Sequence, residues 1–179
     1  MMIITKNAKW VQLRKFIMDD AGRLAGYFSH LSEASKGRFG PHPFDEQSIT
    51  DIYSGQGGYI GYVATEQGSD VIIAYSVINP GYLPQDHDRL RSYGLTLHAD
   101  TDAAFAPSVA DAWQSCGVGN SMFRFIMADL MQKGIRRIIL WGGVQAANDK
   151  AVNYYLKHGF KTIGQFDHNG NNYDMILEL

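Results

Sequence analysis

The sequence predicts a single α/β or α+β domain built around a mixed sheet. Strand-like apolar runs alternate with segments in which apolar residues recur at helical spacing. The last two strand-like runs flank Asn169–Gly170, a strong signal for a β-hairpin. The length of 179 residues fits one domain over 1–179 and is sufficient to bury a core.

The first half of the chain contains strand and helix patterns separated by turn residues. We expect, in order, a strand at 11–18, a helix capped by Asp19 or Asp20, a loop at 30–43, a short helix at 45–55, and strands at 59–66 and 71–78. The apolar face expected for the first helix comprises Leu24, Tyr27, Phe28 and Leu31. Gly55 should end the short helix, and the residues QGSD should form the turn between the two strands.

The second half begins with a polar segment at 80–94 that contains two prolines. We expect a loop there, either solvated or in contact with a substrate. The remaining elements expected are a strand within 95–111 with a tight turn near 99–102, a helix from the double glycine to Gly134, a buried strand at 135–141, a helix from Asn148 to Gly159, and the closing hairpin.

Composition excludes several classes of protein. Sixteen basic and eighteen acidic residues give a net charge of −2, so we expect no nucleic-acid partner. The first residues lack an apolar stretch of signal-peptide length, and no apolar run is long enough to span a bilayer. Cys116 is the single cysteine, which rules out a disulfide within the chain and suits a reducing cytoplasm. We therefore expect a cytoplasmic protein that does not bind membranes.

Two glycines in the segment QSCGVGNSMF, residues 114–123, mark a candidate anion-binding turn. A dinucleotide fingerprint needs a third glycine where Met122 stands, and a P-loop string is absent from the sequence. A helix N-terminus binds anions through its first amides and its dipole, and Gly117 and Gly119 leave those amides accessible. The alternative is that the glycines only make a tight strand-to-helix turn.

The strand before this turn contains Pro107, which cannot donate a hydrogen bond to a sheet. The proline therefore predicts a bulge or a disrupted edge next to the glycine turn. An extended ligand arm rich in amides could pair with the backbone groups left open there. Coenzyme A has such an arm, with a pyrophosphate at its end.

These motifs resemble those of the GNAT superfamily, the Gcn5-related N-acetyltransferases. The pyrophosphate motif of that family is Gln or Arg, two residues, Gly, one residue, then Gly or Ala, and it appears here from Gln114 to Gly119. A second family pattern matches Asn148, Ala151, Tyr155, Lys157, Gly159 and Phe160. One departure concerns positions 115 and 116, which are often basic or glycine in the family and are Ser and Cys here.

The resemblance implies a mostly antiparallel sheet split at a bulged central strand, and direct acetyl transfer from acetyl-CoA to a primary amine of a small molecule or protein. No metal is expected, because His98, Asp100 and Asp102 have no second cluster of ligands to complete a site. The cofactor-binding residues it implies are Val109, Ala110, Asp111, Gln114, Ser115, Cys116, Gly117, Val118, Gly119, Asn120, Asn148 and Tyr155.

The resemblance also assigns the general acid to Tyr155, which lies two helical turns after Asn148 and on the same side of the helix. The general base is open between Asp102, His98 and water, because Ala104 stands where relatives often carry a glutamate. Cys116 is interpreted as a loop residue. The alternative function is a non-catalytic acyl-CoA-binding module, and an exposed strand edge would allow a homodimer.

Overall fold

The structure is a computed structural model that describes residues 1–55 and 57–179. The described residues contain nine strands and six α-helices, and most strand pairs are antiparallel. The chain divides into two compact units, Met1–Ile78 with Ala106–Asp129, and Asn79–Phe105 with Leu130–Leu179. Strands β4 (Ile72–Pro80) and β5 (Asp102–Val109) contribute residues to both units. The mixed α/β class predicted from the sequence is confirmed.

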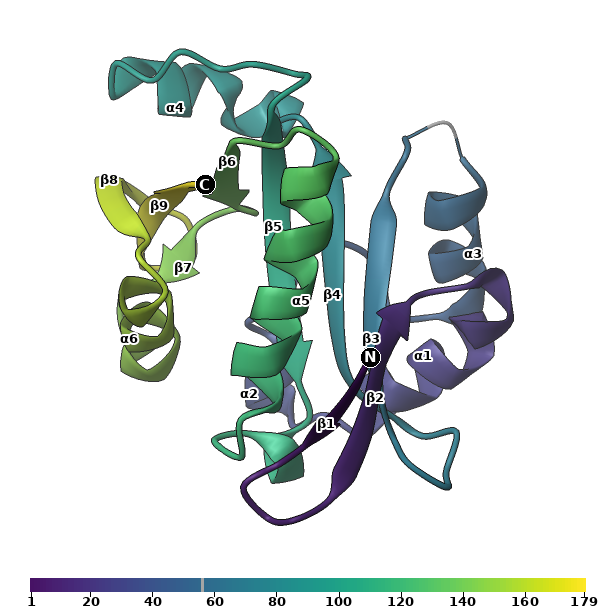
Figure 1. Ribbon diagram of the computed structural model, residues 1–179. Coiled ribbons are helices and arrows are strands. Elements are labelled where there is room, and N and C mark those ends of the chain that lie inside the picture. The colour runs from purple at the N-terminus through teal and green to yellow at the C-terminus, as the bar shows by residue number, and fades with distance from the viewer. Residues whose placement is uncertain (56) are drawn as a thin grey trace. The chain divides into compact units, whose positions relative to one another are not determined.

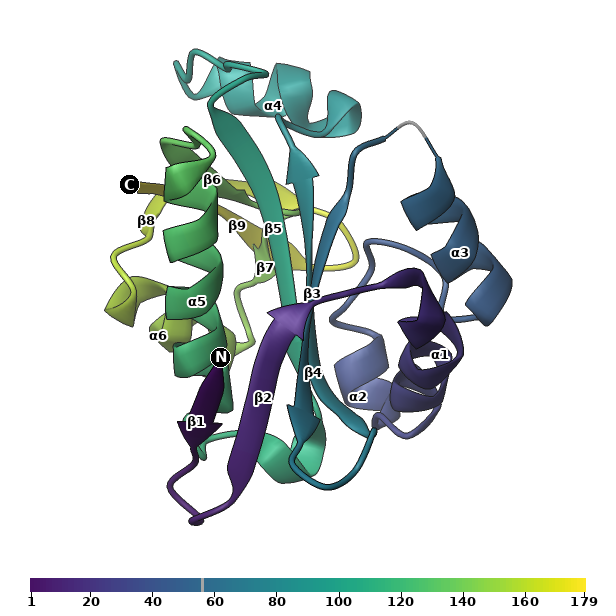
Figure 2. The same ribbon diagram turned by 45° about the vertical axis from the view of Figure 1, so that its right-hand side comes forward.

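The first unit contains an antiparallel sheet in the order β1 (Met2–Ile4), β2 (Trp10–Lys15), β3 (Ile60–Glu66) and β4, followed by the end of β5. Its helices are α1 (Ala21–Ser29), α2 (Glu33–Lys36), α3 (Glu46–Ser54) and the first twelve residues of α5 (Val118–Gln132). Helices α1 and α3 lie on one side of β2–β4, and α5 lies on the other (Figures 1 and 2).

The alternation of side chains along β3 and β4 explains this layering. The Tyr62 hydroxyl donates a hydrogen bond of 2.6 Å to Asp129 on α5, and the Tyr62 ring packs edge-on against Phe125 of the same helix. The side chain of Tyr75, paired with Val63, points to the other face and contacts Phe28 of α1. Both strands are buried on both faces, which accounts for their nearly continuous apolar sequence.

The second unit contains the start of β5 and the strands β6 (Arg137–Leu140), β7 (Val144–Gln145), β8 (Lys161–Asp167) and β9 (Asn171–Glu178). Strand β6 runs parallel to β5, whereas β9 is antiparallel to β6, β7 and β8. The helices are α4 (His87–Ser92) and α6 (Asp149–Lys157). Positive φ angles at Asn169 and Gly170 form the predicted turn between β8 and β9.

Several predicted elements differ from the observed ones. The first strand of the chain is β1, and the strand predicted at 11–18 is β2, which ends at Lys15. The loop predicted at 30–43 contains the short helix α2. No strand forms at 95–101, because β5 begins only at Asp102.

The segment 80–94, predicted to be a loop, contains a 3₁₀ turn at Pro84–Asp86 and helix α4, visible in Figure 2. Contacts distant in the sequence stabilise this helix. Leu90 packs in a buried cluster with Ile139 and Ile176. Arg89 pairs with Asp86 and with Asp174, at 2.8 Å in each case. The segment is therefore packed into the second unit rather than only solvated.

Candidate active site

The double-glycine turn joins β5 to α5 within the first unit. A 3₁₀ turn at Asp111–Trp113 follows the strand, and α5 begins at Val118. Ser115 and Gly117 have φ angles of 66° and 97°, in the left-handed region. A side chain at Gly117 would be strained by this backbone, which explains the glycine at that position. The turn directs the chain sharply into the N-terminus of a fifteen-residue helix.

Side chains within the turn hold it in this conformation. The Gln114 amide donates to the Val109 carbonyl at 3.2 Å. The Cys116 thiol is buried and donates to the Trp113 carbonyl at 2.8 Å, which agrees with its interpretation as a loop residue. Polar groups of the turn are thus used to shape its backbone. The helix N-terminus adds partial positive charge at the end of the turn.

Asp111, predicted to contact the cofactor, connects this turn to α2, and its contact with the cofactor stays a prediction. Its carboxylate accepts hydrogen bonds from the Ser32 amide at 2.9 Å, the Ser35 hydroxyl at 2.6 Å and the Ser32 hydroxyl at 3.2 Å. The bond from the Ser32 amide, together with the hydroxyl bonds, holds the pKa of Asp111 below its usual range. The Ser32 hydroxyl also caps α2 by accepting from the Ser35 amide.

Tyr155, the predicted acid, lies on α6 in the second unit. The helix begins as predicted, because the Asn148 side chain accepts a hydrogen bond of 3.3 Å from the Ala151 amide. Tyr155 is 8% exposed, and its ring packs against Phe160 with centroids 5.3 Å apart. Among the described residues its hydroxyl has no hydrogen-bond partner. Burial raises the pKa of Tyr155 above its ordinary value, so the phenol is protonated at neutral pH.

Asp102, one of the candidate bases, is 1% exposed and bound to Arg137 at the start of β6. The Arg137 guanidinium donates to its carboxylate at 2.6 Å, and the His98 amide donates at 2.8 Å. Both donors bind the same carboxylate oxygen, Oδ2, and hold the side chain in place. These contacts favour a structural role, and its assignment as the base stays a prediction. The side chain of His98 is exposed, and Ala104 is buried in β5.

A buried chain of hydrogen bonds in the first unit was not predicted from the sequence. The His42 ring donates through Nδ1 to the Pro43 carbonyl at 2.7 Å, and its Nε2 accepts from the Tyr75 hydroxyl at 3.0 Å. The Tyr53 hydroxyl then donates to Tyr75 at 2.6 Å. Burial lowers the pKa of His42 and keeps the ring neutral. Its position between two prolines was the only local sign of this role.

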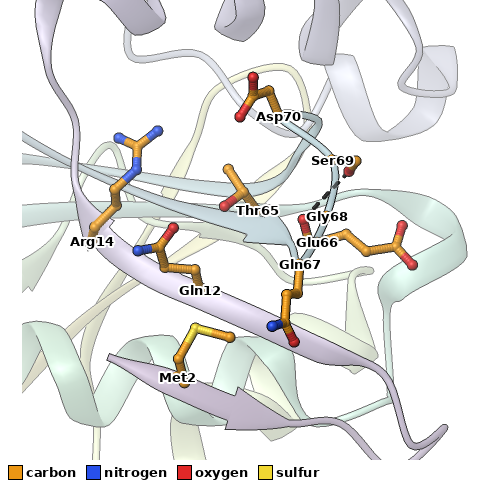
Figure 3. Close-up of a pocket in the computed structure, with 9 residues that line it drawn as sticks. All are labelled: Met2, Gln12, Arg14, Thr65, Glu66, Gln67, Gly68, Ser69 and Asp70. Carbon is orange, nitrogen blue, oxygen red and sulfur yellow. Dashed lines mark hydrogen bonds between the residues drawn. The ribbon is translucent and has the colours of Figure 1, made fainter.

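A hollow of about 430 Å³ lies over β2 and β3 in the first unit (Figure 3). Gln12 and Arg14 line it from β2, and Thr65 lines it from β3. The turn 66–70 closes one side. The hollow contains none of the site residues predicted from the sequence. The Arg14 guanidinium is bound to the buried carboxylate of Asp20, with bonds of 2.5 and 2.8 Å.

Membrane-spanning helices and metal-binding clusters are absent from the residues that the structure describes. None of the helices in 1–55 and 57–179 is long and apolar enough to cross a membrane. Within the same residues, no group of three or more His, Cys, Asp or Glu side chains could hold a metal ion.

Comparison with known proteins connects this geometry to one family. The model of the acetyltransferase (GNAT) family matches residues 24–160. The GNAT domain of PAT from S. lividans has 22% identity and a TM-score of 0.75, with 100% of this chain and 96% of that one covered. The acetyltransferase of the GNAT family from Streptococcus pneumoniae has 18% identity and a TM-score of 0.68, with 94% and 99% covered.

A third solved structure is that of yncA from Salmonella typhimurium, described as a candidate acetyltransferase with its cofactor acetyl-CoA. It has 16% identity and a TM-score of 0.65, with 94% of each chain covered. No curated protein matches the chain. The family match spans both the glycine turn and the helix that carries Tyr155. The chain belongs to the GNAT acetyltransferase family.

Proposed function

We propose that this protein transfers an acetyl group from acetyl-CoA to a primary amine of a small molecule or a protein. The observation that carries the proposal is the turn from Gln114 to Gly119, which enters α5 with a left-handed glycine at Gly117. The position that a Cβ would take at Gly117 is open: outside the two neighbouring residues, the nearest atom is Lys6 Cγ, 4.0 Å away. The family match adds the chemistry of acetyl transfer.

In this proposal the cofactor phosphates bind at the start of α5. The residues of the turn are Gln114, Ser115, Cys116, Gly117, Val118, Gly119 and Asn120. The turn offers backbone amides and the helix dipole, which together favour an anion. Val109 and Ala110 would contact the cofactor arm through their backbone, and Asp111 would act indirectly by fixing the turn to α2.

Acetyl-CoA gives up its acetyl group, and coenzyme A leaves as a thiolate that must gain a proton to become the free thiol. We assign that proton to Tyr155, because its hydroxyl is protonated at neutral pH and donates no hydrogen bond to any described residue. The Asn148 carboxamide is used as the helix cap, so its contribution would be to position α6. Both roles follow from the family pattern at Asn148 and Tyr155.

The acceptor must lose a proton before it attacks. An alkyl amine with a pKa near 10.4 needs about 4–5 kcal/mol to free its lone pair at pH 7. With Asp102 held by Arg137, water or His98 is the better candidate for the base. Holding both reactants in place can supply about 7–11 kcal/mol, so positioning outweighs either proton transfer. The single buried cysteine fits a reducing compartment, and we propose the cytoplasm.

Thiol release from acetyl-CoA tests the proposal. The protein is incubated with acetyl-CoA and a panel of amines that includes polyamines, amino acids and lysine peptides, and free thiol is followed with a colorimetric reagent. Amine-dependent release supports the enzyme. Tight binding of acetyl-CoA without release by any amine would instead support a non-catalytic acyl-CoA-binding module.

A further inference from the structure

The glycine turn lacks positive side chains of its own. No lysine or arginine occurs in residues 95–123, and Ser115 and Cys116 occupy the positions that are often basic or glycine in the family. Acetyl-CoA carries a pyrophosphate and a 3′-phosphate, each of them negatively charged. Backbone amides and the helix dipole are the only positive groups that this segment contributes. A side chain from another part of the chain is therefore needed to add full positive charge.

The loop between β1 and β2 brings such a side chain to the turn. The Lys6 amide donates to the Cys116 carbonyl at 3.0 Å. The Lys6 side chain lies beside Gly117, with Cγ 4.0 Å from the position that a Cβ would take there. The ammonium is three bonds beyond Cγ. Lys6 is thus fixed at its backbone to the turn, and its stem passes the face of the turn that Gly117 leaves open.

Bonds on both sides of Lys6 hold this loop in place. The Thr5 amide donates to the Lys9 carbonyl at 2.9 Å, and the Lys9 amide donates to the Thr5 hydroxyl at 3.1 Å. The Lys9 ammonium lies 4.6 Å above the ring of Trp113, in the 3₁₀ turn before the glycines. The loop therefore meets the turn at two points, and Lys6 is positioned before any ligand binds.

The charges of the two loop lysines are used differently. The Lys9 ammonium pairs with Glu66 at 2.9 Å. Lys6 is exposed, and its ammonium forms no ion pair with a carboxylate in residues 1–55 and 57–179. Among the described residues no carboxylate pairs with the Lys6 ammonium, whereas the charge of Lys9 is already matched by Glu66.

We propose that Lys6 binds a phosphate group of acetyl-CoA and supplies the positive charge that the glycine turn lacks. The inference rests on the proposed function, since it places Lys6 at the same cofactor turn. The shared chemistry is a phosphate monoester or diester, from either the pyrophosphate or the 3′-phosphate. Lys6 acts on affinity and takes no part in acetyl transfer itself.

Calorimetric binding of acetyl-CoA to the full chain tests this role. Lys6→Gln keeps the backbone bond to Cys116 and removes the charge, so we expect the Kd to rise about tenfold, in the range for a charge-assisted hydrogen bond. Lys6→Arg should stay within about threefold of the wild type, because it restores the charge. Lys133→Gln is the matched control, with the same change of charge at an exposed position near the C-terminal end of α5, and should shift the Kd by less than about twofold.

The outcomes separate this inference from the proposed function. Wild-type binding that Lys6→Gln leaves unchanged would overturn the role of Lys6 and leave the cofactor proposal standing. A wild type that binds no acetyl-CoA would overturn the cofactor proposal itself. Repeating the titrations with the 3′-dephospho analogue of acetyl-CoA identifies the phosphate that Lys6 binds. If Lys6→Gln still weakens binding of this analogue about tenfold, Lys6 binds the pyrophosphate. If Lys6→Gln and the wild type bind the analogue equally, Lys6 binds the 3′-phosphate. Thermal unfolding of each variant verifies the fold.

Discussion

Replacing Tyr155 with phenylalanine removes one hydroxyl and separates the proposed catalytic role of this residue from its packing. The ring, which contacts Phe160, is kept. The hydroxyl has no hydrogen-bond partner among the described residues, so no bond of the fold is lost. A buried hydroxyl without a partner is itself unfavourable by about 1–3 kcal/mol. Because the side chain is 8% exposed and retains some access to water, we expect Tyr155→Phe to raise stability by at most about 1 kcal/mol.

The effect on turnover should be far larger. A positioned general acid typically contributes about 10²–10⁴-fold, so kcat should fall by at least about 100-fold. The Michaelis constant for acetyl-CoA should change little, because the proposed phosphate site lies at the other motif. Burial raises the pKa of Tyr155 above its ordinary value of about 10, so the acid stays protonated, and the wild type should show no loss of kcat from this group up to about pH 10.

Tyr75→Phe is the matched control for this experiment. The Tyr75 hydroxyl bonds to His42 and Tyr53, so its removal should lower the free energy of unfolding by about 1–3 kcal/mol. Urea unfolding and thiol release are measured on both variants with the best amine from the panel. Unchanged kcat in Tyr155→Phe would refute the assignment of the acid. If Tyr155→Phe lost 2 kcal/mol or more of its free energy of unfolding, the Tyr155 hydroxyl would have a hydrogen-bond partner after all, since a broken hydrogen bond costs about 1–3 kcal/mol.

Three further predictions concern the scaffold. The Asp20 carboxylate is fully buried between the guanidinium groups of Arg14 and Arg23, so Asp20→Asn should lower the free energy of unfolding in urea by about 3–5 kcal/mol. The control Asp19→Asn, at an exposed position, should change the same free energy by less than about 0.5 kcal/mol. Equal effects of the two substitutions would contradict the buried ion pair. Burial lowers the pKa of His42 in the folded protein, so the unfolded chain takes up a proton first and stability should fall as the pH drops below about 6.5. His42→Gln should weaken this pH dependence of the melting temperature. A pH profile that His42→Gln leaves unaltered would contradict the role of His42. Gly143→Ala should lower the free energy of unfolding by about 1–3 kcal/mol, because φ at Gly143 is +71° and the new Cβ would lie 2.7 Å from the Tyr173 carbonyl oxygen. An unchanged melting temperature of this variant would contradict the strain.

Local patterns predicted those elements whose signals lie within a few residues of one another. The cap at Asn148, the stop at Gly134 and the turn at Asn169–Gly170 all occur where the sequence places them. Helix α4 was missed because contacts distant in the sequence stabilise it: Arg89 binds Asp174, 85 residues away. A polar segment with prolines gives no sign of such a partner.

The residues of the candidate site likewise divide into those that local motifs predict and those that depend on contacts distant in the sequence. The glycine motif and Tyr155 could be found through their resemblance to family motifs, because each motif lies within a short stretch of the sequence. The partners of Asp102 and Asp111 could not, because Arg137 is 35 residues from Asp102 and Ser32 is 79 residues from Asp111. The contact of Lys6 with Cys116 joins a loop near the N-terminus to the glycine turn, and only the folded chain places them together.

The cofactor site is tested most directly by calorimetric titration of acetyl-CoA into the wild type and Gly119→Glu. Gly119 lies in the first turn of α5 and its φ is not in the left-handed region, so glutamate is compatible with the backbone conformation and adds a negative charge at the proposed phosphate site. Gln132→Glu, at the exposed end of the same helix, is the control. We predict micromolar binding by the wild type and the control, and its loss in Gly119→Glu. No binding by the folded wild type, or equal binding by Gly119→Glu, would contradict a phosphate site at this turn.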